Sequence, residues 1–147
     1  MKRFSFRLDT LLDLRKQREE SIKLRLADKN RAIIEKSREL AGMYERLKAL
    51  QTDEKARRIV DTPVLLLRYG VAFRHKLKGD MLRIGRCIDD LRADAAKIQQ
   101  ELVGARKARR ALEIVRDRQS SAWKKAYRRE EQLFIDDVAQ QKYIASR

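Results

Sequence analysis

The sequence has few residues that interrupt a helix. Its 147 residues include one proline and five glycines, so few positions can end or kink a regular element. It has a single cysteine, Cys87, which excludes an internal disulfide, and a single histidine, His75. One chain can therefore assemble neither a metal cluster nor a histidine-activated nucleophile. We expect a protein that is not an enzyme and that holds no metal and no cofactor.

Long hydrophobic runs are also missing. The longest aliphatic run is Val64–Leu67, far short of the roughly 20 apolar residues that a membrane span requires. Charged residues interrupt the first 17 residues, which therefore lack the apolar stretch of a secretory signal. We expect no transmembrane segment and a cytoplasmic protein, and the unpaired Cys87 fits a reducing compartment.

Apolar side chains instead recur every three or four residues over two long stretches. The first stretch runs from Leu8 to Leu50 and the second from Leu77 to Leu112. A mean spacing of 3.5 residues keeps one stripe of each helix against a partner along a left-handed supercoil. The pattern predicts two helices that share one apolar seam.

Four positions of the first stripe are charged, namely Arg15, Glu19, Lys29 and Lys36. We expect Lys29 and Lys36 to pack their aliphatic stems in the seam and to hold their charges in water. Arg15 and Glu19 are four residues apart and could pair with each other.

The break between the two helices lies at the only proline. Pro63 suits a first helical position, and Thr62 before it is the expected N-cap. We expect an all-α fold with a helix over about residues 5–57, a turn within 52–63 and a second helix over about 63–140. The two form an antiparallel coiled-coil hairpin, a single domain over 1–147. With a turn centred near residue 60, Leu8 lies opposite a residue close to Leu112, and the second helix overhangs beyond about Val115.

The overhang retains large apolar side chains, which need something to pack against. Either Phe4 and Phe6 fold back over part of this surface, or another protein buries it, as helix ends often dock in a partner's groove. The residues concerned are Trp123, Tyr127, Leu133, Phe134, Val138 and Tyr143.

The chain is strongly basic, with a formal net charge of +15 and an isoelectric point near 10.4. Such a charge suits nucleic acid, and the densest basic cluster is Arg106–Arg110. Acidic residues run through both helices within reach of the basic ones, however, and no nucleic-acid-binding motif is present. We favour an acidic protein partner over specific nucleic-acid binding, which remains the alternative from another class, beside a coiled coil that only dimerises.

Several segments resemble the flagellar export protein FliJ family. The N-terminal segment Phe4-Ser5-Phe6-Arg7-Leu8 is the first of them. One position departs from the family pattern, because Asp136-Asp137 stands where an Asp-Glu pair is more usual. The other matching positions are Leu11-Leu12, Arg15, Glu19, Leu66, Tyr69, Phe73, Leu77, Ala111-Leu112-Glu113, Glu130-Glu131-Gln132, Ile135 and Ala139.

The resemblance implies a fold similar to the coiled coil of the rotary ATP synthase gamma subunit. It also implies a central stalk of the hexameric flagellar export ATPase, which contacts the export gate membrane protein and escorts export chaperones at the cytoplasmic face of the inner membrane. An injectisome stalk protein of the same architecture is the closest alternative. We expect Leu66, Tyr69, Phe73 and Leu77 to bind the gate. For the ATPase ring we expect Phe4, Phe6, Trp123, Tyr127, Leu133 and Phe134.

Overall fold

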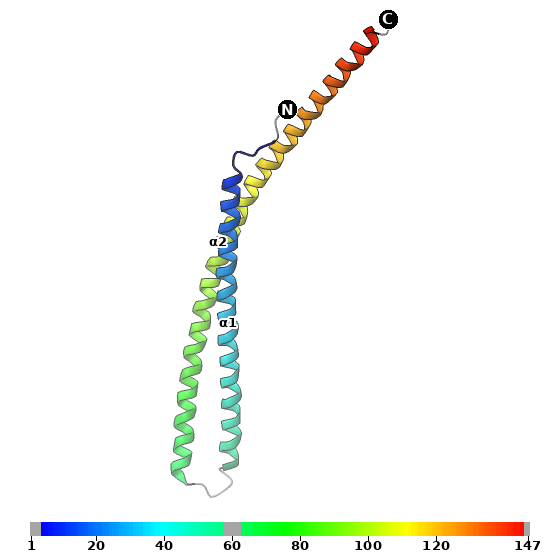
Figure 1. Cartoon of the computed structure of the whole chain (residues 1–147). Coiled ribbons are helices and arrows are strands. Elements are labelled where there is room, and N and C mark those ends of the chain that lie inside the picture. The colour runs from blue at the N-terminus through cyan, green and yellow to red at the C-terminus, as the bar shows by residue number, and fades with distance from the viewer. Residues whose placement is uncertain (1–3, 58–62, 146–147) are drawn as a thin grey trace. The chain divides into compact units, whose positions relative to one another are not determined.

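The computed structural model describes residues 4–57 and 63–145, with side chains up to residue 142. It contains helix α1 (Asp9–Arg57) and helix α2 (Val64–Ala145), and these described residues form no strand (Figure 1). The two long helices pack against each other. The prediction of an all-α helical hairpin is confirmed.

Helix α1 begins at Asp9 rather than near residue 5. The residues before it form a turn, in which the N–H of Asp9 donates to the carbonyl oxygen of Phe6 at 3.2 Å. The N–H of Leu12 then donates to the carbonyl of Leu8 at 2.9 Å. Asp9 lies in the first turn of the helix and Arg57 in the last, where their charges complement the helix dipole.

Helix α2 begins directly after Pro63, whose carbonyl accepts the N–H of Leu66 at 3.0 Å. Because proline lacks an N–H, it suits a helix start, where that group would have no helical partner. The predicted N-cap, Thr62, lies outside the described residues. The helix continues to Ala145, a few residues beyond the expected end.

The chain divides into two compact units. The turn unit is Ser21–Leu102, and the terminal unit combines Met1–Glu20 with Val103–Arg147. In the turn unit, α1 and α2 lie side by side and run antiparallel (Figure 1). Ion pairs between the helices define their register. They join Arg25 to Glu101 at 3.2 Å, Lys29 to Asp94 at 2.9 Å and Arg74 to Glu54 at 2.7 Å.

The predicted seam forms the core of the turn unit. The seam side chains of α2 are mostly buried. On α1, Ile22 is buried and the seam positions from Leu26 to Leu50 are half-buried. Lys29 packs partly as expected, but its ammonium group bonds Asp94 across the seam. The buried α2 residues of the seam are Leu77, Met81, Ile84, Ile88, Ala95, Ile98 and Leu102.

In the terminal unit the seam continues with Leu12, which is completely buried, and with Glu19. Leu8 is an exception, because 40% of it remains exposed. Glu19 faces Arg106 and Arg109. Because two antiparallel helices rise equally per residue in opposite directions, Leu8 lies opposite about residues 117–120. The expected pairing of Leu8 with Leu112 was therefore wrong, because the helices pair about a centre closer to residue 63 than to residue 60.

Candidate partner-binding surfaces

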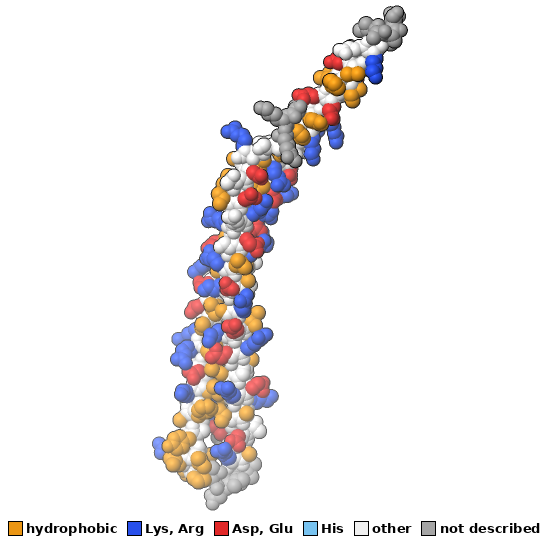
Figure 2. All heavy atoms as spheres, viewed as in Figure 1, with side chains coloured by type: hydrophobic (Ala, Val, Ile, Leu, Met, Phe, Trp, Pro, Cys, Tyr) orange, Lys and Arg blue, Asp and Glu red, His pale blue; other side chains and the backbone are white. Residues whose placement is uncertain are grey.

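The first ten residues of α2 expose an unusual number of apolar side chains. Val64 is 72% exposed and Leu65 is 62% exposed. Figure 2 shows hydrophobic side chains gathered at the start of α2. Contiguous apolar patches on a protein surface commonly mark interaction sites. We call the set the turn-end patch, which consists of Val64, Leu65, Leu66, Tyr69, Val71 and Phe73.

Three of the four residues predicted to bind the export gate belong to this patch. Leu66, Tyr69 and Phe73 are exposed, whereas Leu77 is buried in the seam. The heptad phase already placed Leu77 in the seam. The structure therefore brings the first three together on a surface and assigns Leu77 to packing.

A bonded carboxylate lies beneath the patch. Glu54 of α1 accepts a hydrogen bond from Arg74 at 2.7 Å, and both side chains are largely buried. The other carboxylate oxygen of Glu54 is buried and has no hydrogen-bond partner among the described residues. A Cβ atom on Gly70 would lie 3.2 Å from that oxygen. Glycine at this position therefore lets the Glu54 carboxylate lie close against α2.

A second apolar surface was missed by the sequence analysis. A groove of about 510 Å³ runs between the helices in the turn unit. Tyr44 and Leu82 are exposed beside it, and each directly follows a seam residue. An apolar residue directly after a seam residue makes the apolar stripe of the helix wider than the seam alone. This widening is the sequence feature that could have indicated the groove. The apolar lining residues are Leu40, Tyr44, Leu47, Met81, Leu82 and Gly85.

The aromatic residues of the terminal unit pack on one another. The rings of Phe4 and Trp123 lie 6.0 Å apart in a tilted arrangement, and those of Trp123 and Tyr127 stack at 5.4 Å. Phe6 is buried. A hydrogen bond to Glu131 raises the pKa of Tyr127. The N-terminal segment thus folds back over Trp123, and the unpaired part of α2 does not begin at Val115 as expected.

After Tyr127, the residues of α2 are exposed to solvent without interruption over several turns. Every residue from Arg128 to Asp137 is exposed, including Leu133, Phe134 and Ile135. Val138 is half-buried, and the side chain of Tyr143 lies outside the described residues. We call Leu133, Phe134 and Ile135 the C-terminal patch. Of the residues predicted to bind the ATPase ring, only Leu133 and Phe134 belong to it.

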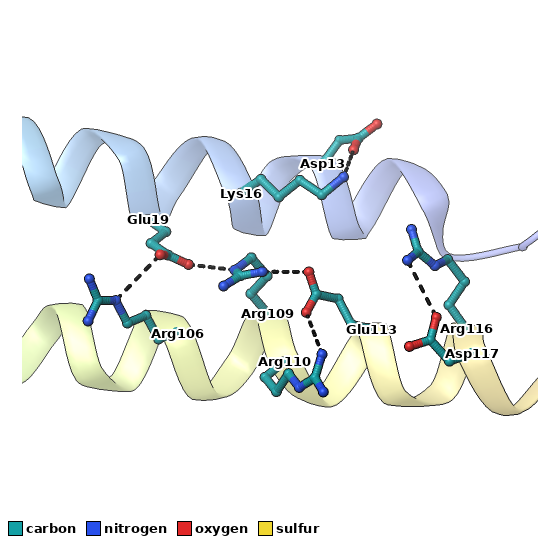
Figure 3. A network of polar contacts seen from close by, with 9 residues as sticks. All are labelled: Asp13, Lys16, Glu19, Arg106, Arg109, Arg110, Glu113, Arg116 and Asp117. Carbon is teal, nitrogen blue, oxygen red and sulfur yellow. Dashed lines mark hydrogen bonds and ion pairs between the residues drawn. The ribbon is translucent and has the colours of Figure 1, made fainter.

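A network of charges crosses the seam of the terminal unit (Figure 3). The guanidinium of Arg109 lies between two carboxylates, donating to Glu19 at 2.6 Å and to Glu113 at 2.5 Å. Arg106 forms a further ion pair with Glu19 at 3.5 Å, and Arg110 donates to Glu113 at 3.3 Å. The buried Glu19 therefore pairs across the seam with α2, a partner that the four-residue spacing to Arg15 did not indicate.

The network shifts the acidity of its members. Hydrogen bonds to Glu19 and Glu113 raise the pKa of Arg109. Burial acts to raise the pKa of Glu113, but the hydrogen bonds from Arg110 and Arg109 outweigh it and lower that pKa. Three arginines of the basic cluster at 106–110 are thus engaged with carboxylates. This pairing weakens the case that the cluster binds nucleic acid, since phosphate would have to compete with the carboxylates.

The side chains that most often serve in catalysis or metal binding form no cluster in the described part of the chain. His75 and Cys87 are exposed on α2, and no group of three His, Cys, Asp or Glu side chains among the described residues is placed to hold a metal ion. Across residues 4–57 and 63–145, neither helix has an apolar stretch long enough to cross a bilayer.

The fold and these surfaces define an all-α coiled-coil hairpin whose described residues include exposed apolar patches and an apolar groove. The family model described as flagellar FliJ protein matches residues 4–147. The chain therefore belongs to the flagellar FliJ family and is related to flagellar protein export. No curated protein sequence and no solved structure matches it.

Proposed function

We propose that this protein is a non-enzymatic stalk of the flagellar export ATPase, with the C-terminal patch in the ATPase ring and the turn-end patch on the export gate. The family supports the setting, and the exposed apolar side chains near the two ends of α2 support the two contacts. The observation that carries the proposal is the C-terminal patch, because three large apolar side chains stand in water where no described residue covers them.

Burial gives the ring contact its driving force. Covering an exposed leucine or phenylalanine contributes roughly 1.5–3 kcal/mol for each side chain. Leu133 and Phe134 are both about two-thirds exposed, at 64% and 69%. An amphipathic helix that places such residues in a partner's groove is a common mode of recognition.

The gate contact rests on the turn-end patch. Leu66, Tyr69 and Phe73 lie at spacings of three and four residues, so they share one side of α2. Tyr69 and Phe73 supply rigid aromatic surface, which is enriched at protein interfaces. The hydrogen bond between Arg74 and Glu54 holds this part of α2 against α1.

Export chaperones are the third proposed partner, and the groove beside Tyr44 and Leu82 offers an apolar surface that could receive them. A protein in this role acts in the cytoplasm and associates peripherally with the inner membrane. No cofactor is required, since a stalk acts by transmitting contact and not by chemistry.

Co-sedimentation with the cognate export ATPase tests the proposal. A chain ending at Gln132 loses the C-terminal patch but keeps the seam, the ring contacts of Trp123 and the hydrogen bond of Tyr127 to Glu131. We expect this shortened chain to remain helical and to lose binding to the ATPase ring. Undiminished binding would place the ring contact elsewhere on the chain.

A further inference from the structure

We propose that the start of α2 inserts into an anionic lipid surface, with Val64 and Leu65 reaching into the bilayer interface and basic side chains of α2 contacting lipid phosphates. This contact uses part of the turn-end patch, whose residues Leu66, Tyr69 and Phe73 we propose for the export gate. It requires neither the ATPase nor the export gate, so it can fail or succeed independently of them.

The geometry of the exposed apolar residues favours lipid over a protein groove. Val64, Leu65 and Leu66 are consecutive and all exposed. Neighbours on a helix point about 100 degrees apart, so these three side chains point in different directions around the start of α2. A groove can cover one side of a helix, whereas a fluid lipid phase surrounds a helix end. Because Val64 points away from the side shared by Leu66, Tyr69 and Phe73, and Leu65 lies between the two directions, these two side chains fit insertion better than docking.

Charge complements this arrangement. Residues 63–79 contain four Lys or Arg residues and no Asp or Glu. Arg74 is bonded to Glu54, while the others form no ion pair with a described residue. Basic residues beside exposed apolar ones are typical of segments that bind anionic membrane surfaces. The available cations are Arg68, Lys76 and Lys78.

The adjoining end of α1 does not cancel this charge. Residues 45–57 carry four Lys or Arg residues and three Asp or Glu residues. Of the three acidic residues, Asp53 is paired with Arg57 and Glu54 with Arg74. The surface around the turn-end patch is therefore net positive.

Spacing along α2 places a cation close to the exposed apolar residues. At about 1.5 Å per residue, Arg68 lies roughly 6 Å along the helix from Val64, and its long side chain can reach the headgroups while Val64 is inserted. Tyr69 follows directly, and tyrosine favours the boundary between lipid and water. Val64 and Leu65 would thus lie below the level at which Arg68 and Tyr69 meet the headgroups.

Vesicle flotation of the full chain tests the proposal at about 150 mM salt, which weakens purely electrostatic attraction. The probes are vesicles of phosphatidylcholine alone and vesicles containing equal parts of phosphatidylglycerol and phosphatidylcholine. We expect binding only to the anionic vesicles. The Val64→Ser/Leu65→Ser variant should bind about tenfold more weakly, because two inserted side chains are lost. The control Leu24→Ser/Ile34→Ser, which changes two exposed residues of the turn unit, should bind like the unchanged chain.

A second pair of variants separates local charge from the high net charge of the chain. Arg68→Gln/Lys76→Gln/Lys78→Gln should weaken binding, whereas Arg31→Gln/Arg38→Gln/Arg92→Gln, with the same loss of charge in the same unit, should weaken it clearly less. Equal effects of the two triple variants would show attraction by net charge alone and would overturn the proposal. So would unchanged binding of Val64→Ser/Leu65→Ser, or binding of these residues to a gate protein without any binding to vesicles.

Insertion depth gives an independent readout. Leu65→Trp in a Trp123→Phe background carries one tryptophan, at the proposed site. Its fluorescence should be quenched by lipids brominated on their acyl chains. A tryptophan at position 24 in the same background should not be quenched. Equal quenching at the two positions, or none at either, would contradict insertion of the start of α2.

Discussion

Neighbouring leucines of α1 differ sharply in burial, because Leu12 lies in the seam and Leu14 does not. Leu12 is fully buried, while Leu14, two residues further along α1, is 56% exposed. Leu12→Ala should lower the free energy of unfolding by about 2–5 kcal/mol, because it removes buried surface and leaves a cavity. Leu14→Ala should change it by no more than about 0.5 kcal/mol. Chemical denaturation measures both, and similar losses would show that α1 does not pack through Leu12.

The ion pair between Lys29 and Asp94 makes the stability of the fold depend on pH. The hydrogen bond from Lys29 lowers the pKa of Asp94 below its ordinary value of 3.8. The pair therefore contributes stability above that ordinary value, and the contribution is lost as the pH falls through the lowered pKa. Titration of the Asp94 carboxyl by NMR should show a higher pKa in Lys29→Met than in the unchanged chain. Lys16→Met should leave it unchanged, and an unshifted Asp94 in Lys29→Met would contradict the pairing.

At the scale of the helices, the glycines differ in the space around them, and Gly70 of α2 lies against a side chain of α1. A Cβ at Gly79 or Gly104 would meet nothing within 4 Å, whereas one at Gly70 would lie 3.2 Å from Glu54. Gly79→Ala and Gly104→Ala should each raise stability by roughly 0.5–1 kcal/mol, because alanine loses less backbone freedom on folding. Gly70→Ala should gain less or be destabilising. Thermal unfolding of the three variants tests this, and equal gains would mean that Glu54 yields freely.

The turn-end patch allows a test at the start of α2. Tyr69→Ser/Phe73→Ser should weaken binding to the cytoplasmic part of the export gate by about tenfold or more, because aromatic anchors often dominate such contacts. Helicity, followed by circular dichroism, should change little since both residues are exposed. Leu24→Ser/Ile34→Ser is the matched control. Binding that survives in the Tyr69 and Phe73 variant would remove this surface from the gate contact.

The sequence predicted the elements well because heptad spacing depends only on neighbours along the chain. Every predicted seam position except Leu8 is buried or half-buried, and Pro63 correctly marked the start of α2. Register was harder to predict. The partners of Glu19 lie about 90 residues away, and a small error in the centre of the turn changes every such pair. The packing of Phe4 on Trp123 depends on the same register. The sequence could therefore offer the folding back of Phe4 only as one of two alternatives.

For the whole molecule, the distribution of exposed residues matters more than composition. A net charge of +15 suggests nucleic acid, yet many arginines pair with carboxylates on the same or the facing helix. Consecutive large apolar residues are exposed in the first turn of α2, at 64–66, and again at residues 133–135. A chain of the flagellar FliJ family with such patches is suited to join two partners, which is the central claim of the stalk proposal.

ATP hydrolysis by the cognate export ATPase tests that claim most directly. The unchanged chain should stimulate hydrolysis, and Leu133→Ser/Phe134→Ser should lose most of the stimulation, because its C-terminal patch can no longer be buried in the ring. The control Leu14→Ser/Val103→Ser changes two exposed apolar residues of the same unit and should stimulate fully. Full stimulation by the Leu133 and Phe134 variant, or none by the unchanged chain, would contradict the stalk proposal.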